Sequence, residues 1–136
     1  MLEHEVARLE VSNRLLCVRG IGDAFTGHHR ETPVPQDYEV AGQLTLTHDP
    51  FAAIALKLDG LVLAGHTHCG QLRIPDFGPI WARSDAPKEA ICGEYKEAGL
   101  TLWVTSELGE SILPVRLFAP SSWDLLTIFQ SGPNPT

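Results

Sequence analysis

The chain has 136 residues, a one-domain length, and carries a formal charge of −7 at pH 7. Hydrophobic residues make up 43% and charged residues 20%, which is ordinary globular usage and argues against a fibrous or disordered chain. Because so acidic a surface repels a phosphate backbone, the composition disfavours non-specific nucleic-acid binding, but it is compatible with one phosphate group held at a bound metal ion.

Short apolar or alternating segments predict a strand-rich fold with one helix. The seven predicted strands, in chain order, are residues 5–10, 14–19, 43–47, 61–64, 101–105, 114–118 and 123–129. Pro50 suits the first turn of a helix, so residues 51–58 are predicted to be helical. The Pro- and Gly-rich stretch 70–99 is expected to be mostly loop, with short strands at 72–74 and near 91.

The sequence shows no membrane segment and no disulfide framework. Its apolar runs are shorter than the roughly 18 residues that a bilayer span requires, and the charged first twenty residues lack the apolar core of a signal peptide. We therefore expect a cytoplasmic chain, apart from any anchor in a preceding part. Cys17, Cys69 and Cys92 form no CxxC pair, so free thiols in a reducing compartment are expected.

The segment 61–71 carries the clearest chemical signal. A buried strand is predicted to end just before His66 and His68, and glycines flank the two histidines. If the strand geometry continued, alternate side chains would point the same way, with the imidazoles about 6–7 Å apart. That spacing suits one shared metal ion or two neighbouring ones, whereas a pair of surface histidines in a turn is the simpler alternative.

His48 strengthens the metal interpretation because it also ends a predicted strand. The helix 51–58 would bring strand 43–47 beside strand 61–64 through a right-handed crossover. The carboxyl ends of such strands are where α/β sheets place their sites. Three histidines are thus expected to meet at adjacent strand ends.

Other polar residues are assigned structural roles. Asp23 is expected in an Asx turn rather than as an acid or ligand. His4, His28 and His29 are expected to be solvated, and Cys69 to be a small loop residue rather than a soft ligand. The three tryptophans are expected to pack in the core; they are Trp81, Trp103 and Trp123. No GxSxG elbow supports a nucleophilic triad.

Two motifs together carry a family resemblance. THDP at 47–50, followed by GHTHCGQ at 65–71, resembles the last two signature blocks of the calcineurin-like metallophosphoesterases, and more closely their bacterial phosphodiesterase branch. Further matches to that branch lie in the turn 20–23, the Pro-rich loop from Ile74, residues 93–95, the strand at Leu102 and residues 113–120. The resemblance covers about residues 5–130.

The resemblance implies a layered β-sandwich of the α/β or α+β type, and a hydrolase with a binuclear metal site. In that family two divalent ions of the manganese, iron or zinc class, bridged by an Asp and a hydroxide, cleave phosphoesters. Carried over by motif, His48 and His66 would ligate one ion and His68 the other. A phosphoester, more specifically a phosphodiester, is the implied substrate.

The chain departs from the family by lacking the earlier blocks. No D-x-H, no G-D-x-x-D with the bridging Asp, and no G-N-H-[DE] with the leaving-group His is present. Residues 105–109 and 120–122 also differ from the usual pattern. The resemblance is therefore to the C-terminal half of such an enzyme, and no catalytic residue is assigned.

These departures leave three readings of the chain open. It is expected to be a hydrolase fragment that is inactive alone and binds metal weakly or not at all. Alternatively, it is a non-catalytic metal-binding or structural remnant, or one half of a two-chain enzyme whose partner is the missing N-terminal half. Residues 1–130 would form the half-domain and residues 131–136 a disordered tail.

Overall fold

A computed structural model describes residues 2–35 and 41–129. Its strands are β1 (Val6–Val11), β2 (Arg14–Gly20), β3 (Gly42–Leu46), β4 (Gly60–Ala64), β5 (Leu72–Ile74), β6 (Gly78–Trp81), β7 (Gly93–Glu97) and β8 (Leu100–Val104). Its helices are α1 (Phe51–Ala55) and two 3-10 turns, η1 (His68–Gly70) and η2 (Lys88–Ala90).

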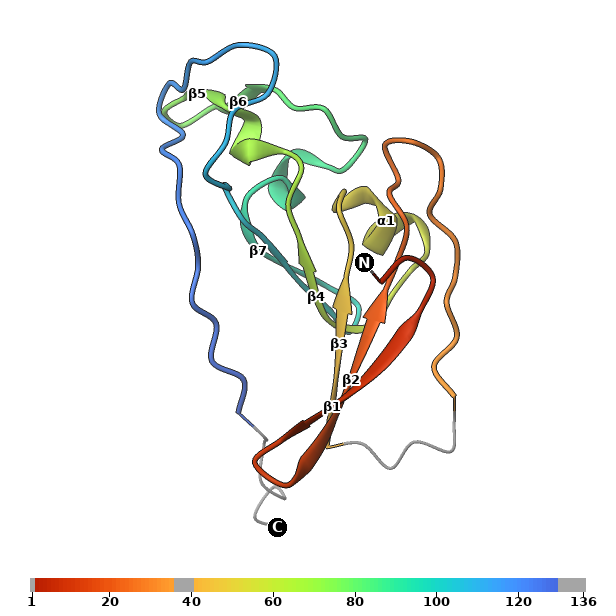
Figure 1. Cartoon of the computed structure of the whole chain (residues 1–136). Helices are drawn as coiled ribbons and strands as arrows, with labels where there is room; N and C mark the ends of the chain where they lie inside the picture. The colour runs from red at the N-terminus through yellow and green to blue at the C-terminus, as the bar shows by residue number, and fades with distance from the viewer. Residues whose placement is uncertain (1, 36–40, 130–136) are drawn as a thin grey trace.

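The architecture is a six-stranded mixed sheet in the order β1-β2-β3-β4-β8-β7, with β5 and β6 paired separately (Figure 1). The four central strands, β2, β3, β4 and β8, run parallel to one another. The outer strands β1 and β7 are antiparallel to their neighbours. All four central strands therefore end at the same edge of the sheet.

The hydrophobic core lies where α1 packs with the central strands. Ala52 and Ala53 of α1 are fully buried in one cluster with Val62 and Leu102. Small alanines allow the five-residue helix to lie close to the strands. Packing against the sheet, rather than the helix propensity of its residues, stabilises so short a helix. A buried Arg19 fastens β2 to β3 by donating hydrogen bonds to Thr45 Oγ1 at 3.0 and 3.1 Å.

The first five predicted elements are confirmed, with shifted ends. The hairpin 6–20, the strand at 42–46 and the strand at 60–64 are present, and β3 lies parallel to β4 as expected. The helix is shorter than predicted because it stops at Ala55 and the chain turns at Lys57, whose φ is +50°. The strand predicted at 101–105 is β8.

The predicted strands at 114–118 and 123–129 are wrong. Within the described residues these segments form no ladder, and only an isolated bridge joins Leu117 to Leu72. A strand exists through hydrogen bonds to a neighbour, and the segment 123–129 has no strand beside it. The structure also has a 3-10 turn at 88–90 instead of a strand near 91, and adds β6 and β7 within the predicted loop.

The coarse fold class is a strand-rich α/β or α+β chain with one α-helix and a mixed sheet. Within the described parts of the chain, no helix is long and apolar enough to cross a bilayer. The predicted tail 131–136 lies outside the described residues, as do residues 36–40.

Candidate functional site

The residues that follow the four parallel strands gather at one edge of the sheet. Asp23 follows β2, His48 follows β3, His66 and His68 follow β4, and Glu107 follows β8. The Gly65 N–H donates to the His48 carbonyl at 3.0 Å, which ties the β3 and β4 loops together. This is the place in an open α/β sheet where ligands bind.

His48 and His66 lie against each other. Their ring centroids are 4.5 Å apart and the rings meet edge to face. His66 Nε2 is buried and has no hydrogen-bond partner within the described residues. Buried polar atoms in proteins are normally paired, so this nitrogen has an unused lone pair or an unused N–H beside a second imidazole.

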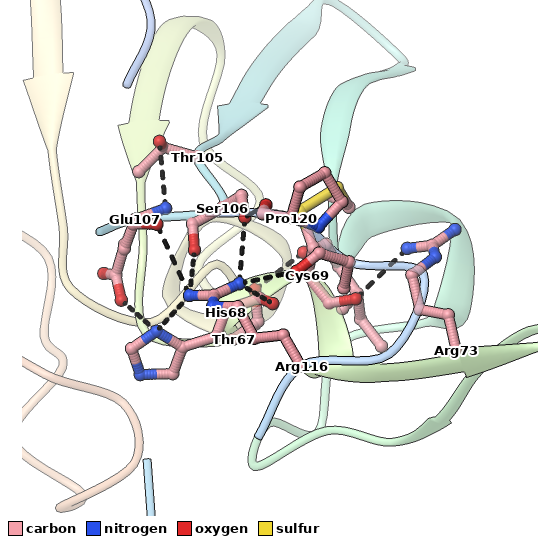
Figure 2. The surroundings of a disulfide bond; sticks show 12 residues. Thr67, His68, Cys69, Arg73, Thr105, Ser106, Glu107, Arg116 and Pro120 are labelled. Carbon is pink, nitrogen blue, oxygen red and sulfur yellow. Dashed lines mark hydrogen bonds and ion pairs between the residues drawn. A yellow bond between two sulfur atoms is a disulfide. The ribbon is translucent and has the colours of Figure 1, made fainter. Parts of the chain in front are cut away.

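Glu107 links the other histidine to this pair. One carboxylate oxygen, Oε2, lies 2.8 Å from His68 Nδ1, and the other, Oε1, accepts the His66 backbone N–H at 2.7 Å. Figure 2 shows the contact to His68. A carboxylate accepts only, so His68 Nδ1 carries the proton and Nε2 keeps its lone pair. Carboxylates orient metal-binding histidines in this way.

Burial lowers the pKa of His68 below its ordinary value of 6.5. Glu107 acts against that shift and raises the pKa, whereas the nearby Arg116 and the other two histidines lower it further. Burial is the largest of these effects because the side chain is only 16% exposed. His68 is therefore held in its neutral form, which is the form that ligates metals.

Arg116 fixes the loop that carries Glu107. Its guanidinium donates to the Ser106 and Ala119 carbonyls at 3.0 Å each, to Ser106 Oγ at 3.1 Å, and also to the Gly109 carbonyl. Figure 2 shows this guanidinium among the carbonyl groups, beside His68. The planar fork of arginine suits such a multiple contact. Arg116 thus holds the backbone through its two terminal nitrogens, whereas its buried Nε has no hydrogen-bond partner among the described residues.

The loop 65–71 has an unusual backbone. His66, His68, Cys69 and Gln71 all adopt positive φ, between +44° and +68°. Such conformations are uncommon for residues with a side chain and concentrate at functional sites. The expected strand-like alternation of His66 and His68 is wrong, because β4 ends at Ala64 and the two imidazoles have different neighbours.

Gly65 is required by close approach rather than by its own φ. A Cβ at this position would lie 2.1 Å from Glu107 Oε1. The carboxylate that holds both histidine positions therefore occupies the space that a side chain would take.

A disulfide joins Cys69 to Cys92, so the expectation of free thiols is wrong for these two residues (Figure 2). The expectation failed because their 23-residue separation in sequence hides a Cα–Cα distance of 4.6 Å. Cys17 is free and buried. Thr67 Oγ1 donates to the Ile91 carbonyl at 2.7 Å, so a bond on each side of His68 anchors the loop to the segment 91–92.

Asp23 is in an Asx turn, as predicted. Its carboxylate accepts hydrogen bonds from the Phe25 N–H at 3.1 Å and from Thr26 Oγ1 at 3.0 Å. His28 is exposed, also as predicted. The prediction of solvation is wrong for His4 and His29, because both have a buried Nδ1 without a hydrogen-bond partner in the described residues.

The prediction that the tryptophans pack in the core is wrong for two of them. Trp81 at the end of β6 is 56% exposed and Trp123 is 73% exposed. Trp103 on β8 is half-buried. The exposure of a tryptophan therefore depends on which segments pack beside it, and residue type alone does not predict this.

The three histidines do not by themselves complete a metal site. Within residues 2–35 and 41–129, no group of three or more His, Cys, Asp or Glu side chains has a geometry that could hold a metal ion. The unpartnered His66 nitrogen fits a ligand role, whereas the nearby Glu107 contacts the backbone N–H of His66 and the ring of His68. The residues present therefore fit part of a metal site, not a whole binuclear one.

Sequence reasoning missed Glu107 and Arg116 as parts of the site. Glu107 stands in the segment 105–109 where the chain departs from the family pattern, so the motif gave no reason to select it. The available signal was the position of Glu107 directly after β8, the strand next to β4. That signal can be recognised only when the order of the strands in the sheet is known.

Comparison with known proteins gives one informative match. No protein-family model matches the chain, and no solved structure matches it significantly. A protein of Bacillus subtilis (strain 168), described as "Uncharacterized metallophosphoesterase YkuE", is 32% identical over 87 residues. The match covers 62% of this chain and 30% of that protein, so the chain spans less than a third of its relative's length. The similarity suggests the metallophosphoesterase superfamily for the matched part.

Proposed function

We propose that this chain supplies the histidine-bearing part of a metal-dependent phosphoester hydrolase, acting on a phosphodiester. The observation that carries the proposal is the His48–His66 pair, 4.5 Å apart, with a buried and unpartnered His66 Nε2 at the parallel strand ends. The similarity to a protein described as a metallophosphoesterase supports the same reaction class.

In this proposal His48 and His66 hold one divalent ion, of the manganese, iron or zinc class, and His68 faces a second. Metal ions supply a water of lowered pKa and a positive charge for the phosphoryl oxygens. Glu107 orients His68 and keeps its Nε2 free, and Arg116 fixes the loop that carries Glu107. The disulfide from Cys69 to Cys92 restrains the same loop.

The proposal requires carboxylate ligands that the described residues do not place at the site. Two like-charged ions a few ångströms apart repel each other unless an anionic ligand lies between them. A further part of the same domain, or a second polypeptide that assembles with this one, would supply that ligand and the acid for the leaving group. We therefore expect little hydrolysis of a phosphodiester by this chain alone.

The alternative is a non-catalytic metal-binding or structural module. The absence of a three-ligand group within the described part of the chain favours it. The two proposals agree on where a metal would bind, and they differ in whether added carboxylate ligands produce turnover.

The test is calorimetric titration of the chain with zinc or manganese. The His48→Ala/His66→Ala variant should lose the weak binding that the wild type shows, because it removes both adjacent imidazoles. The affinity should also fall as the pH is lowered, since protonated imidazole does not ligate.

His28→Ala is the matched control, because His28 is an exposed imidazole that lies beside Glu3 and borders the hollow that His48 also lines. It should bind as the wild type does. Identical heats for the wild type and the double variant would overturn the proposed metal site and, with it, the metal-dependent function.

A further inference from the structure

An arginine near the histidine pair forms no ion pair within the part of the chain that the structure describes. The Arg83 guanidinium carbon lies 4.6 Å from the centre of the Phe25 ring. The Phe25 ring in turn lies 4.9 Å from the His66 imidazole, so Phe25 bridges the guanidinium to the histidine pair. Within the described residues no carboxylate forms an ion pair with Arg83.

Arg83 and Trp81 border two spaces at once. One is a cavity of about 380 Å³ that Phe25 also lines. The other is a small space above His66 and His68, lined again by Trp81 and Arg83. Ligand cavities in proteins commonly measure about 300–1,000 Å³, so the larger space is big enough for one small organic molecule, whereas the space at the histidines measures only about 10 Å³.

The chemistry of these side chains points to an anion joined to a flat ring. A guanidinium without an ion-pair partner binds phosphoryl oxygens through its fork of N–H donors. Trp81 is 56% exposed and offers an indole face, on which a planar ring can stack. The chain carries a net charge of −7. The positive charge of the Arg83 guanidinium at this place is opposite in sign to that net charge.

One acidic group bears on the same cavity. Asp49 is buried and its carboxylate already accepts hydrogen bonds from the Phe51 N–H and Ser84 Oγ. Asp85 is exposed and lines the cavity without such partners among the described residues. Its charge repels an anion, so the phosphoryl group is expected on the Arg83 side that faces the histidines.

We propose that Arg83 and Trp81 recognise the substrate: Arg83 binds a phosphoryl oxygen beside His66, and Trp81 stacks on an aromatic ring carried by the ester. The substrate class is therefore a phosphodiester in which one of the two ester groups is a nucleoside or an aryl alcohol, and a monoester that carries the ring and the phosphate contains both recognised features. This inference rests on the proposed hydrolase function and names its substrate. Phe25 is a positioning residue, since its ring contacts both the Arg83 guanidinium and the His66 imidazole.

The test is an NMR titration of the metal-free chain with four probes. AMP and 4-nitrophenyl phosphate carry both a ring and a phosphate, whereas ribose 5-phosphate and adenosine each carry one of them. AMP or 4-nitrophenyl phosphate should bind more tightly than ribose 5-phosphate and adenosine do. Tighter binding of AMP would indicate a nucleoside ester, and tighter binding of 4-nitrophenyl phosphate would indicate an aryl ester. The shifted amides should include residues 81–85.

Substitutions then assign the contacts. Arg83→Gln should weaken AMP binding about tenfold, which corresponds to the loss of a charge-assisted hydrogen bond. Trp81→Ala should weaken AMP binding but leave ribose 5-phosphate binding unchanged. Asp85→Asn should strengthen the binding of both phosphates. Because these side chains are partly exposed, unchanged circular dichroism should show that the variants are folded.

Matched controls are Lys88→Gln, an exposed cation of the same segment that lines a different cavity, and Trp123→Ala, an exposed tryptophan elsewhere. Neither should alter AMP binding. Absence of AMP and 4-nitrophenyl phosphate binding, or equal binding by wild type and Arg83→Gln, would overturn the recognition site. Equal affinity for AMP and ribose 5-phosphate would overturn the aromatic preference. The proposed metal function is tested separately, by the calorimetric titration of the wild type and the His48→Ala/His66→Ala variant with metal.

Discussion

Glu107 connects two of the candidate ligand positions through one side chain. Its two oxygens contact His68 Nδ1 and the His66 N–H at 2.8 and 2.7 Å. Glu107→Gln keeps an oxygen for the His66 N–H but replaces the second acceptor with an NH2 group, so the contact to His68 is lost. We expect a loss of about 1–2 kcal/mol of stability and a further fall in the His68 pKa, because Glu107 is the group that raises it.

The measurement is a histidine NMR pH titration and a thermal melt of the metal-free protein. A folded-state pKa below the unfolded value means that the unfolded chain binds the proton first. Stability should therefore decline as the pH falls below about 6.5, and Glu107→Gln should move the folded-state midpoint lower still. Glu110→Gln, an exposed neighbour, is the control. An unchanged His68 midpoint in Glu107→Gln would contradict the contact.

At the residue scale the sequence predicted the placement of the histidines better than their contacts. The prediction of three histidines at strand ends depended on local patterns, and the structure places all three at one edge of the sheet. The partners Glu107 and Cys92 depend on which strands and loops become neighbours. That information is spread along the chain and is not visible in any single segment.

At the scale of elements, the loop after β4 is held by the Cys69–Cys92 disulfide, which closes a long loop around β5 and β6. A crosslink that closes a loop of this size stabilises the folded state by about 3 kcal/mol in the chain-entropy account. Reduction, or the substitution Cys92→Ser, should lower the melting temperature. Metal affinity should fall as well, because the bond adjoins His68.

Thermal melts with and without reductant test this expectation. Reductant should lower the melting temperature of the wild type and of a Cys17→Ala control but should not affect Cys92→Ser, which lacks the bond. Cys17 is buried and free, so its substitution changes packing but not the crosslink. Equal melting temperatures for oxidised and reduced wild type would show that the disulfide does not hold the loop.

The elements that could be predicted are those that bury an apolar face within the chain. The strands from 6–20 and β3, β4 and β8 have this property, and α1 was recognised from Pro50 and the apolar run behind it. The segment 123–129 is also rich in residues that suit a strand, but its side chains lie exposed, and it forms no ladder within the described residues. The pattern of residues in a segment indicates that the segment suits a strand. Whether the strand forms depends on a neighbouring strand with which it can pair.

At the scale of the whole molecule, the apolar side chains without cover lie mainly after β8. In Figure 1 this part of the chain runs in blue away from β5 and β6, along one side of the molecule. Leu125 and Phe129 are 82% and 84% exposed. Exposed apolar stretches of this kind are typical of surfaces that bind another protein, which agrees with the proposal that further protein completes the domain.

An extended apolar segment without a partner should also associate with copies of itself. We expect sedimentation velocity to show oligomers that increase with protein concentration, and we expect Leu125→Ser/Phe129→Ser to shift the population toward monomer. The physical reason is that association removes apolar surface from water and offers backbone hydrogen bonds to an extended segment.

Phe77→Ser is the control, because Phe77 is 81% exposed but lies at the turn between β5 and β6. If the control reduced association as much as the double variant, general surface hydrophobicity would be the cause. A monomer at all concentrations would contradict the prediction that the segment 123–129 seeks a partner.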